Sequence, residues 1–189
     1  MLPAAALGAG LVLAYMSGQG PNNLVSVKSQ RNQKVYQVQN LPDKQNACEM
    51  MANIHEKLEA LINRYKRDPN SAADPRVQTM IERFRPENMC ENNIDANSTS
   101  YSENKGERIV VCLRDKQKPY PLVDENTVMF VVLHEMAHLM TTTIGHTPEF
   151  WANFRRILKD AIGAGVYHEV NYTREPVEYC GMKITSSPL

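Results

Sequence analysis

The chain has 189 residues, and its 21 basic and 21 acidic side chains give a formal net charge of zero. This length is enough to bury a hydrophobic core, and 42% hydrophobic with 22% charged residues is typical of a globular protein rather than a disordered one. Zero net charge argues against a protein that holds nucleic acid by bulk electrostatic attraction.

Charged side chains are absent from the N-terminal end. The first is Lys28, and residues 1–16 are almost all apolar. We expect residues 1–20 to form a short membrane anchor, although the stretch is shorter than the roughly 20 apolar residues that span a bilayer. A cleaved signal peptide and a buried core segment are the alternatives. Lys28, Arg31 and Lys34 follow, and this positive charge predicts a main domain on the cytosolic side or inside a virion.

The next segment, residues 21–45, is rich in Asn, Gln and Ser and contains two prolines. Such a composition predicts a linker that leads into an extended segment. The main domain is therefore expected to cover residues 46–189.

Two helices are predicted in the first half of this domain. Apolar residues recur at helical spacing over residues 46–67, and Asp68-Pro69-Asn70 ends this pattern. Asp74 followed by Pro75 predicts a second helix that runs to about Phe84.

A loop and a strand come next. Residues 86–106 are polar and rich in Asn and Ser, which predicts a long loop. The β-branched run Ile109–Leu113 predicts a short strand, which could align an extended peptide along a sheet edge.

Two further helices and a strand complete the domain. Within residues 126–140, the run 128–133 is apolar, which predicts a buried helix. Thr147-Pro148-Glu149 combines a capping residue, a proline and an acid, and predicts a helix that ends near Gly163. Residues 166–173 are expected to form a last strand.

The motif that carries chemistry is His134-Glu135-Met136-Ala137-His138. On a helix, residues four apart point to one side, so His134 and His138 can bind one zinc ion. Glu135 lies beside the first histidine and can take the proton of a water on the metal. A buried helix would pay a few kcal/mol for such polar groups if they had no function.

A catalytic zinc ion needs a third protein ligand. His146 is the favoured one, because Gly145 lets the chain turn back toward the helix and Thr147 starts the next helix at once. The rival ligands are a later carboxylate or another histidine: Glu149, Glu169, Glu175, Glu178 or His168.

The four cysteines, Cys48, Cys90, Cys112 and Cys180, form no CxxC pair. Their number permits two disulfides but requires none, and buried free thiols are the favoured interpretation.

The run from His134 to His138 and the following Gly145-His146-Thr147-Pro148-Glu149-Phe150-Trp151 resemble the WLM and SprT-like zinc metallopeptidases. The resemblance is strongest to WLM-type metallopeptidases of large DNA viruses, which share a segment like residues 101–106 and a strand like residues 110–114. It implies an α+β, zincin-like fold with a small sheet packed on an HExxH active-site helix.

By that resemblance, one catalytic Zn²⁺ is held by His134, His138 and His146, and Glu135 is the general base that activates the zinc-bound water for peptide hydrolysis. Phe150 and Trp151 are implied to be packing residues. The second electrophile for the oxyanion is left open among four candidates: Tyr167, His168, Tyr172 and Tyr179. Met182 is expected to be a core residue rather than a methionine beneath the metal.

The expected partners are a protein or peptide substrate, a membrane through the N-terminal segment, and virion components. The alternative function is a membrane-anchored structural protein of a virion that keeps the zincin-like fold without proteolysis. A DNA-linked role is disfavoured, because the small basic cluster of Arg155, Arg156 and Lys159 is interpreted as a solvated helix face, and the sequence shows no zinc finger or basic stripe.

Overall fold

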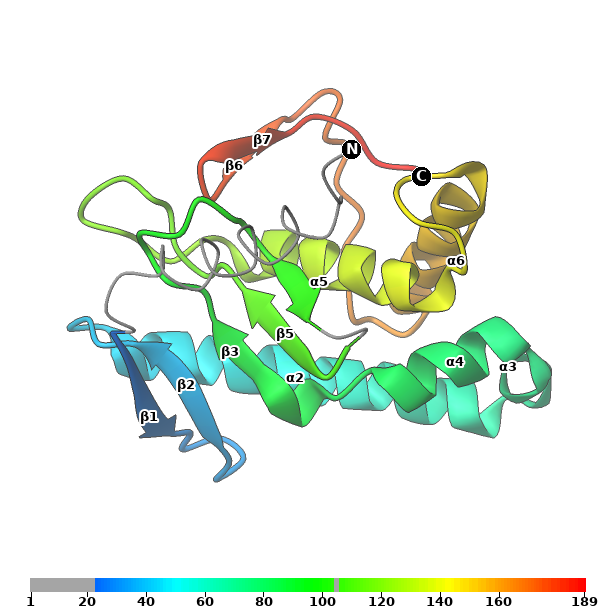
Figure 1. Cartoon of the computed structure of the whole chain (residues 1–189), viewed down its shortest axis with the longest axis horizontal. Helices are drawn as coiled ribbons and strands as arrows, with labels where there is room; N and C mark the ends of the chain where they lie inside the picture. Colours follow the sequence, from blue (N-terminus) through cyan, green and yellow to red (C-terminus); the bar gives the residue numbers. More distant parts are fainter. Residues whose placement is uncertain (1–22, 104–105) are drawn as a thin grey trace, which may run out of the picture.

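The structure, a computed structural model, describes residues 23–103 and 106–189 and shows a mixed sheet covered by helices (Figure 1). The predicted anchor, residues 1–20, lies outside the described residues. Within the described ranges, no helix has the length and apolar character needed to cross a membrane.

The sheet has five strands in the order β1-β2-β3-β5-β4. Their bounds are Leu24–Lys28 for β1, Val35–Gln39 for β2, Met89–Glu91 for β3, Tyr101–Glu103 for β4 and Arg108–Val111 for β5. β1 and β2 form an antiparallel hairpin, and β3 runs parallel to both β2 and β5. β4 is antiparallel to β5 and lies at one edge of the sheet.

Two segments differ from the sequence-based expectation. The β1–β2 hairpin occupies much of residues 21–45, the predicted linker and extended segment, and belongs to the sheet. The predicted loop 86–106 contains the 3₁₀ turn η1 (Pro86–Asn88) and two strands, β3 and β4. Each of these strands has three residues, which is too short for an alternating pattern to be recognised in the sequence.

Two of the first three helices follow the sequence-based prediction. α2 spans Lys44–Arg67 and buries the predicted apolar stripe, as Ile54, Leu58 and Leu61 are fully buried. Asp68 caps the short helix α3 (Pro69–Ala73), and Asp74 caps α4 (Pro75–Arg83). The predictions of α2 and α4 are therefore confirmed, whereas α3 was not predicted.

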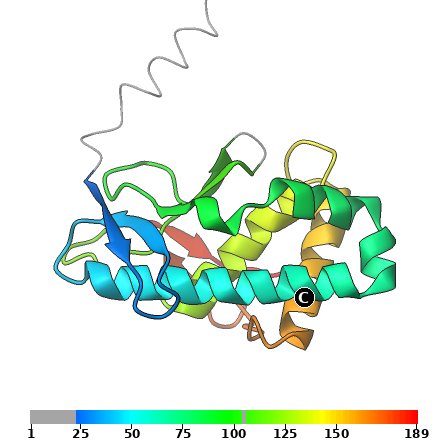
Figure 2. The ribbon, with the colours of Figure 1, turned by 90° about the horizontal axis from the view of Figure 1, so that it is seen from below.

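The last two helices are those predicted at and after the HExxH motif. α5 spans Glu125–Met140 and α6 spans Pro148–Gly163, both close to their predicted bounds. The Asp124 side chain caps α5 through the Thr127 backbone N–H at 2.9 Å. α2 and α5 lie on the same side of the sheet (Figures 1 and 2), so the two helices share the hydrophobic core.

The predicted last strand at residues 166–173 is wrong. These residues form no strand, and the C-terminal hairpin consists of β6 (Val177–Tyr179) and β7 (Met182–Ile184). Tyr167 and Tyr172 pack on Phe130 of α5, with ring centroids 6.0 and 4.7 Å away. Their aromatic character therefore serves the core and not strand pairing.

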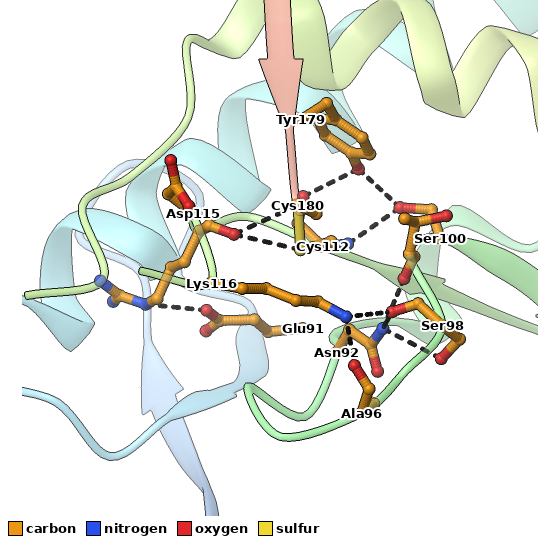
Figure 3. Close-up of a disulfide and its surroundings, with 12 residues drawn as sticks. Glu91, Asn92, Ala96, Ser98, Ser100, Cys112, Asp115, Lys116, Tyr179 and Cys180 are labelled. Carbon is orange, nitrogen blue, oxygen red and sulfur yellow. Dashed lines mark hydrogen bonds and ion pairs between the residues drawn. A yellow bond between two sulfur atoms is a disulfide. The ribbon is translucent and has the colours of Figure 1, made fainter. Parts of the chain in front are cut away.

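A disulfide between Cys112 and Cys180 fastens the C-terminal hairpin to the chain that follows β5 (Figure 3). The Tyr179 hydroxyl reinforces this junction, since it donates to the Cys112 carbonyl oxygen at 2.9 Å and lies 2.6 Å from Ser100 Oγ. The free-thiol interpretation is wrong for these two cysteines and holds for Cys48 and Cys90, which are buried and unpaired. Cysteines 68 residues apart are brought together by topology, which spacing does not reveal.

Gly106 sits where the β4–β5 hairpin approaches α4. Its φ is +101°, and a Cβ there would clash with the Arg83 carbonyl oxygen and lie 3.1 Å from Leu139 Cδ1. Gly106→Ala is therefore expected to lower the free energy of unfolding by about 1–3 kcal/mol in urea denaturation. Gly163→Ala is the matched control, because its Cβ would come no closer than 3.9 Å to Arg64 Nη2. An equal loss in both variants would contradict this packing.

Reduction of the disulfide is expected to lower the free energy of unfolding by about 2–4 kcal/mol, because the cross-link closes a long loop in the unfolded chain. Urea denaturation of the wild type with and without a dithiol reductant measures this. The Cys112→Ala/Cys180→Ala double variant should be insensitive to the reductant. A wild type that does not respond to the reductant would show that this pair is not linked.

Candidate metal centre and active site

Three imidazoles converge at the C-terminal half of α5. The Nε2 atom of His134 lies 3.2 Å from Nε2 of His138 and 3.1 Å from Nε2 of His146. The ligand atoms of all three residues lie within 4.8 Å of one another. The structure thus brings together the three histidines that the sequence singled out.

The helix supplies two of these side chains and a loop supplies the third. His134 and His138 are four residues apart on α5, so both point to one side. His146 lies on the loop between α5 and α6, where Gly145 has a φ of +84° that favours glycine. This backbone turn returns the chain toward α5.

Glu149, in the first turn of α6, holds that loop. Its carboxylate accepts hydrogen bonds from the backbone N–H of Thr142 at 3.1 Å and of Thr143 at 3.2 Å. The two threonine hydroxyls also donate to it, at 2.8–3.1 Å. The bonds from Thr142 and Thr143 hold the pKa of Glu149 below its usual range. Glu149 therefore anchors the loop, whereas the sequence alone allowed it as a rival metal ligand.

Phe150 forms the floor beneath the three histidines. It is fully buried, and its ring stacks on His138 with centroids 4.3 Å apart. The same ring meets His134 at 4.8 Å and His146 at 4.7 Å, both edge-on. Trp151 is 41% exposed and lies beside His146 at 5.7 Å. The structure places both aromatic residues in packing contacts.

The donor set fits a tetrahedral metal ion. Zinc–nitrogen bonds of about 2.0–2.1 Å place tetrahedral ligand nitrogens about 3.3 Å apart, close to the two measured nitrogen separations of 3.1 and 3.2 Å. Burial, followed by the charges of His138 and His146, lowers the pKa of His134 to about 3. A neutral imidazole is the form that binds a metal, so the cluster is prepared for a cation.

Glu135 lies next to His134 and is buried. Burial raises the pKa of its carboxyl group to about 7, and a hydrogen bond from the backbone of Ser102 opposes this rise. Ser102 is the middle residue of the edge strand β4. The candidate base is thus fixed between the active-site helix and the edge of the sheet, a contact that no sequence signal indicates.

The remaining rival ligands do not belong to the histidine cluster. The backbone of His168 is paired with the side chain of Asn126, in the first turn of α5, at 2.9 and 2.8 Å. His168, Glu169, Glu175 and Glu178 are absent from the one group of metal-ligating side chains found among the described residues. His146 is the third histidine of that group.

The candidates for the oxyanion electrophile make contacts outside the histidine cluster. The Tyr179 hydroxyl is engaged with Ser100 and Cys112, and Tyr167 and Tyr172 pack on Phe130. Over the described ranges, no hydrogen bond or ring contact joins any of the four candidates to the histidine cluster.

Two other sequence expectations concern Met182 and the small basic cluster of α6. Met182 lies in β7 and is 47% exposed, so it is neither a core residue nor a residue beneath the histidines. Arg156 pairs with Asp74 at 2.6 Å, and Arg155 donates to the carbonyl oxygen of Pro188. Two members of the small basic cluster thus make intramolecular contacts.

The sequence and the fold both have known relatives. The WLM domain family matches residues 30–175. An uncharacterized protein of Acanthamoeba polyphaga mimivirus is 31% identical over 175 residues, which cover 92% of this chain and 88% of that protein. An uncharacterized protein of Invertebrate iridescent virus 3 is 46% identical over 69 residues, or 36% of this chain and 42% of that protein.

Among solved structures, the crystal structure of Wss1 from Saccharomyces cerevisiae is similar, with a TM-score of 0.52. The superposition covers 68% of this chain and 87% of Wss1, at 18% sequence identity. At this identity the similarity shows the fold alone, and it confirms the predicted zincin-like α+β architecture.

Loss of the Glu149 anchor is expected to weaken zinc binding. Glu149→Gln keeps the size of the side chain but removes the charge that receives the Thr142 and Thr143 bonds, so His146 is held less firmly. We expect the affinity for Zn²⁺, measured by competition with a chromophoric chelator, to fall about tenfold. Glu175→Gln is the control with unchanged affinity, and equal affinities in all three proteins would contradict the anchoring role.

Proposed function

The chain belongs to the WLM domain family, and from this premise we propose that it is a zinc-dependent metallopeptidase. The family is metallopeptidase-like and generally zinc-dependent, which supports a protease at a coarse level. Our finer proposal assigns His134, His138 and His146 as the ligands of one Zn²⁺ and Glu135 as the general base. The observation that carries it is the convergence of three imidazole nitrogens beside a buried carboxylate.

The chemistry follows from the residues present. A zinc ion held by His134, His138 and His146 would supply a Lewis acid that polarises a carbonyl group and makes water more acidic. Glu135 then acts as the proton carrier: its carboxylate accepts a proton from the attacking water and returns it to the leaving amine. Burial raises the pKa of that carboxyl group, which favours its role as a proton acceptor. A cation at the histidines would lower that pKa again.

The edge strand β4 is the better candidate for aligning a peptide. The sequence-based hypothesis named the Ile109–Leu113 strand, but β5 is flanked by β3 and β4 and has no unpaired edge. This hypothesis is wrong for β5. β4 pairs with β5 alone among the described strands, and its Ser102 backbone contacts Glu135. A peptide that adds to β4 as a further strand would pass beside the candidate base.

The alternative is a structural protein that keeps the fold without proteolysis. The complete set of His134, Glu135, His138 and His146 disfavours it, since a protein without catalysis has no need of the buried Glu135. Attachment to a membrane through residues 1–20, and with it the cytosolic or virion-internal location, stays a prediction.

The decisive variant is Glu135→Gln, which removes the base and keeps the three histidines. We expect peptide hydrolysis by the zinc-loaded protein to fall at least about a hundredfold, while one Zn²⁺ per chain remains bound. Cleavage is followed on a peptide library by mass spectrometry, and zinc by elemental analysis of the same samples.

His146→Ala is the companion variant, and it should lose both zinc and hydrolysis. A wild type that binds zinc but cleaves no peptide would favour the structural alternative. A wild type that binds no zinc would refute the proposed centre.

A further inference from the structure

A pocket of about 650 Å³ opens directly beside the candidate centre. It is bounded by α4, by the last turn of α5 including His138, by Ser102 of β4, and by residues 141–144 of the loop that carries His146. The loop and the β4–β5 hairpin project to the same side of the molecule (Figure 2). The pocket is therefore continuous with both the histidine cluster and the strand edge proposed to receive the peptide.

The charged side chains among the described residues that line this pocket are all basic. Two arginines of α4, Arg76 and Arg83, line it, and no acidic residue is among the described residues of its wall. Three acids near the wall are engaged: Asp74 pairs with Arg76 and Arg156 at 2.7 and 2.6 Å, Glu149 receives the bonds from the 142–143 loop, and Glu135 is hydrogen-bonded to the Ser102 backbone. An anionic group entering the pocket would meet no repelling carboxylate on its wall.

Arg83 is the cation that remains available. The Arg76 guanidinium is compensated by Asp74 and also donates to Asn153 at 3.2 Å. Arg83 makes no ion pair within the described ranges, and its Nη1 donates to the Leu139 carbonyl oxygen at a long 3.4 Å. That bond orients the guanidinium against the C-terminal end of α5, one residue beyond His138. The other N–H groups can receive a carboxylate in the fork geometry that arginine favours.

The part of the wall formed by residues 141–143 is held in place before any peptide arrives. The Glu149 anchor fixes Thr142 and Thr143, and the Thr141 hydroxyl donates to the Ala137 carbonyl oxygen at 2.7 Å. A cavity whose walls are already ordered loses less conformational entropy when a side chain enters, which favours selection.

We propose that this pocket receives an acidic side chain of the peptide substrate and that Arg83 selects it. The inference rests on the proposed peptidase function and deepens it, because it names the substrate class. Peptides with Asp or Glu at one defined position relative to the cleaved bond are the preferred substrates.

The test compares matched peptides. Zinc-loaded wild-type protein is given a peptide library, cleavage sites are read by mass spectrometry, and kcat/KM is measured for a cleaved peptide and its copy with Glu replaced by Gln. We expect about a tenfold preference for the Glu peptide, the size of one charge-assisted hydrogen bond in a partly exposed pocket. Arg83→Gln should reduce the ratio to about one, Arg83→Lys should keep part of it, and Arg83→Glu should favour Lys at that position.

Arg85→Gln is the matched control, because Arg85 is exposed two residues after α4 ends and does not line the pocket. It should keep the preference, and thermal melting of every variant checks that the fold is intact. Cleavage without an acidic preference at any position, or with a preference that survives Arg83→Gln, overturns this inference and leaves the peptidase function standing.

Failure of the peptidase function itself gives a different result, namely no cleavage by the wild type. A binding experiment still tests the inference in that case. Fluorescence polarisation of a labelled Glu-containing peptide and its Gln counterpart should show about tenfold tighter binding of the Glu peptide to the wild type and equal binding to Arg83→Gln. Equal binding of the two peptides to the wild type overturns the inference.

Discussion

The docking of the first turn of α6 against the last two turns of α5 is the constraint on which the site depends. Phe150 lies under all three imidazoles, and it is the third residue of a helix whose cap, Thr147, directly follows His146. The third histidine and the floor of the cluster are therefore placed by one short segment. Any shift of α6 along α5 would move His146 and Phe150 together, so the packing of the two helices determines the geometry of the centre.

This junction also has to satisfy the backbone carbonyl groups at the buried end of α5. Asn153 of α6 is fully buried and donates to the Met140 carbonyl oxygen at 3.4 Å and to Thr141 Oγ1 at 3.0 Å. Arg76 in turn donates to the Asn153 side-chain oxygen, and Asp74 pairs with Arg76 and Arg156. The end of the active-site helix is thus connected to α4 and α6 by hydrogen bonds whose partners come from three elements. A buried carbonyl left unpaired there would cost about 1–3 kcal/mol.

The parts that could be predicted from the sequence are those set by local physics. Helices α2, α4, α5 and α6 follow from apolar periodicity and from caps such as Asp74-Pro75 and Thr147-Pro148. The HExxH spacing and Gly145 place the three histidines for the same reason, since one helix turn and one tight loop suffice. Strands β3 and β4 could not be recognised, because three residues carry no periodicity and their pairing is non-local. Phe150 beneath the cluster and Ser102 beside Glu135 depend on that non-local pairing and packing.

Distant parts of the chain together position Glu135 relative to the edge strand β4. Ser100 Oγ accepts the Cys112 backbone N–H at 2.9 Å and meets the Tyr179 hydroxyl at 2.6 Å, just before β4 begins (Figure 3). Because Tyr179 is held next to Cys180, the disulfide and the C-terminal hairpin restrain the start of β4. Two residues later, Ser102 contacts the Glu135 carboxylate. The position of the base relative to the sheet edge is accordingly set by three segments remote in sequence. A three-residue edge strand that pairs on one side alone would otherwise have few contacts to hold it in register.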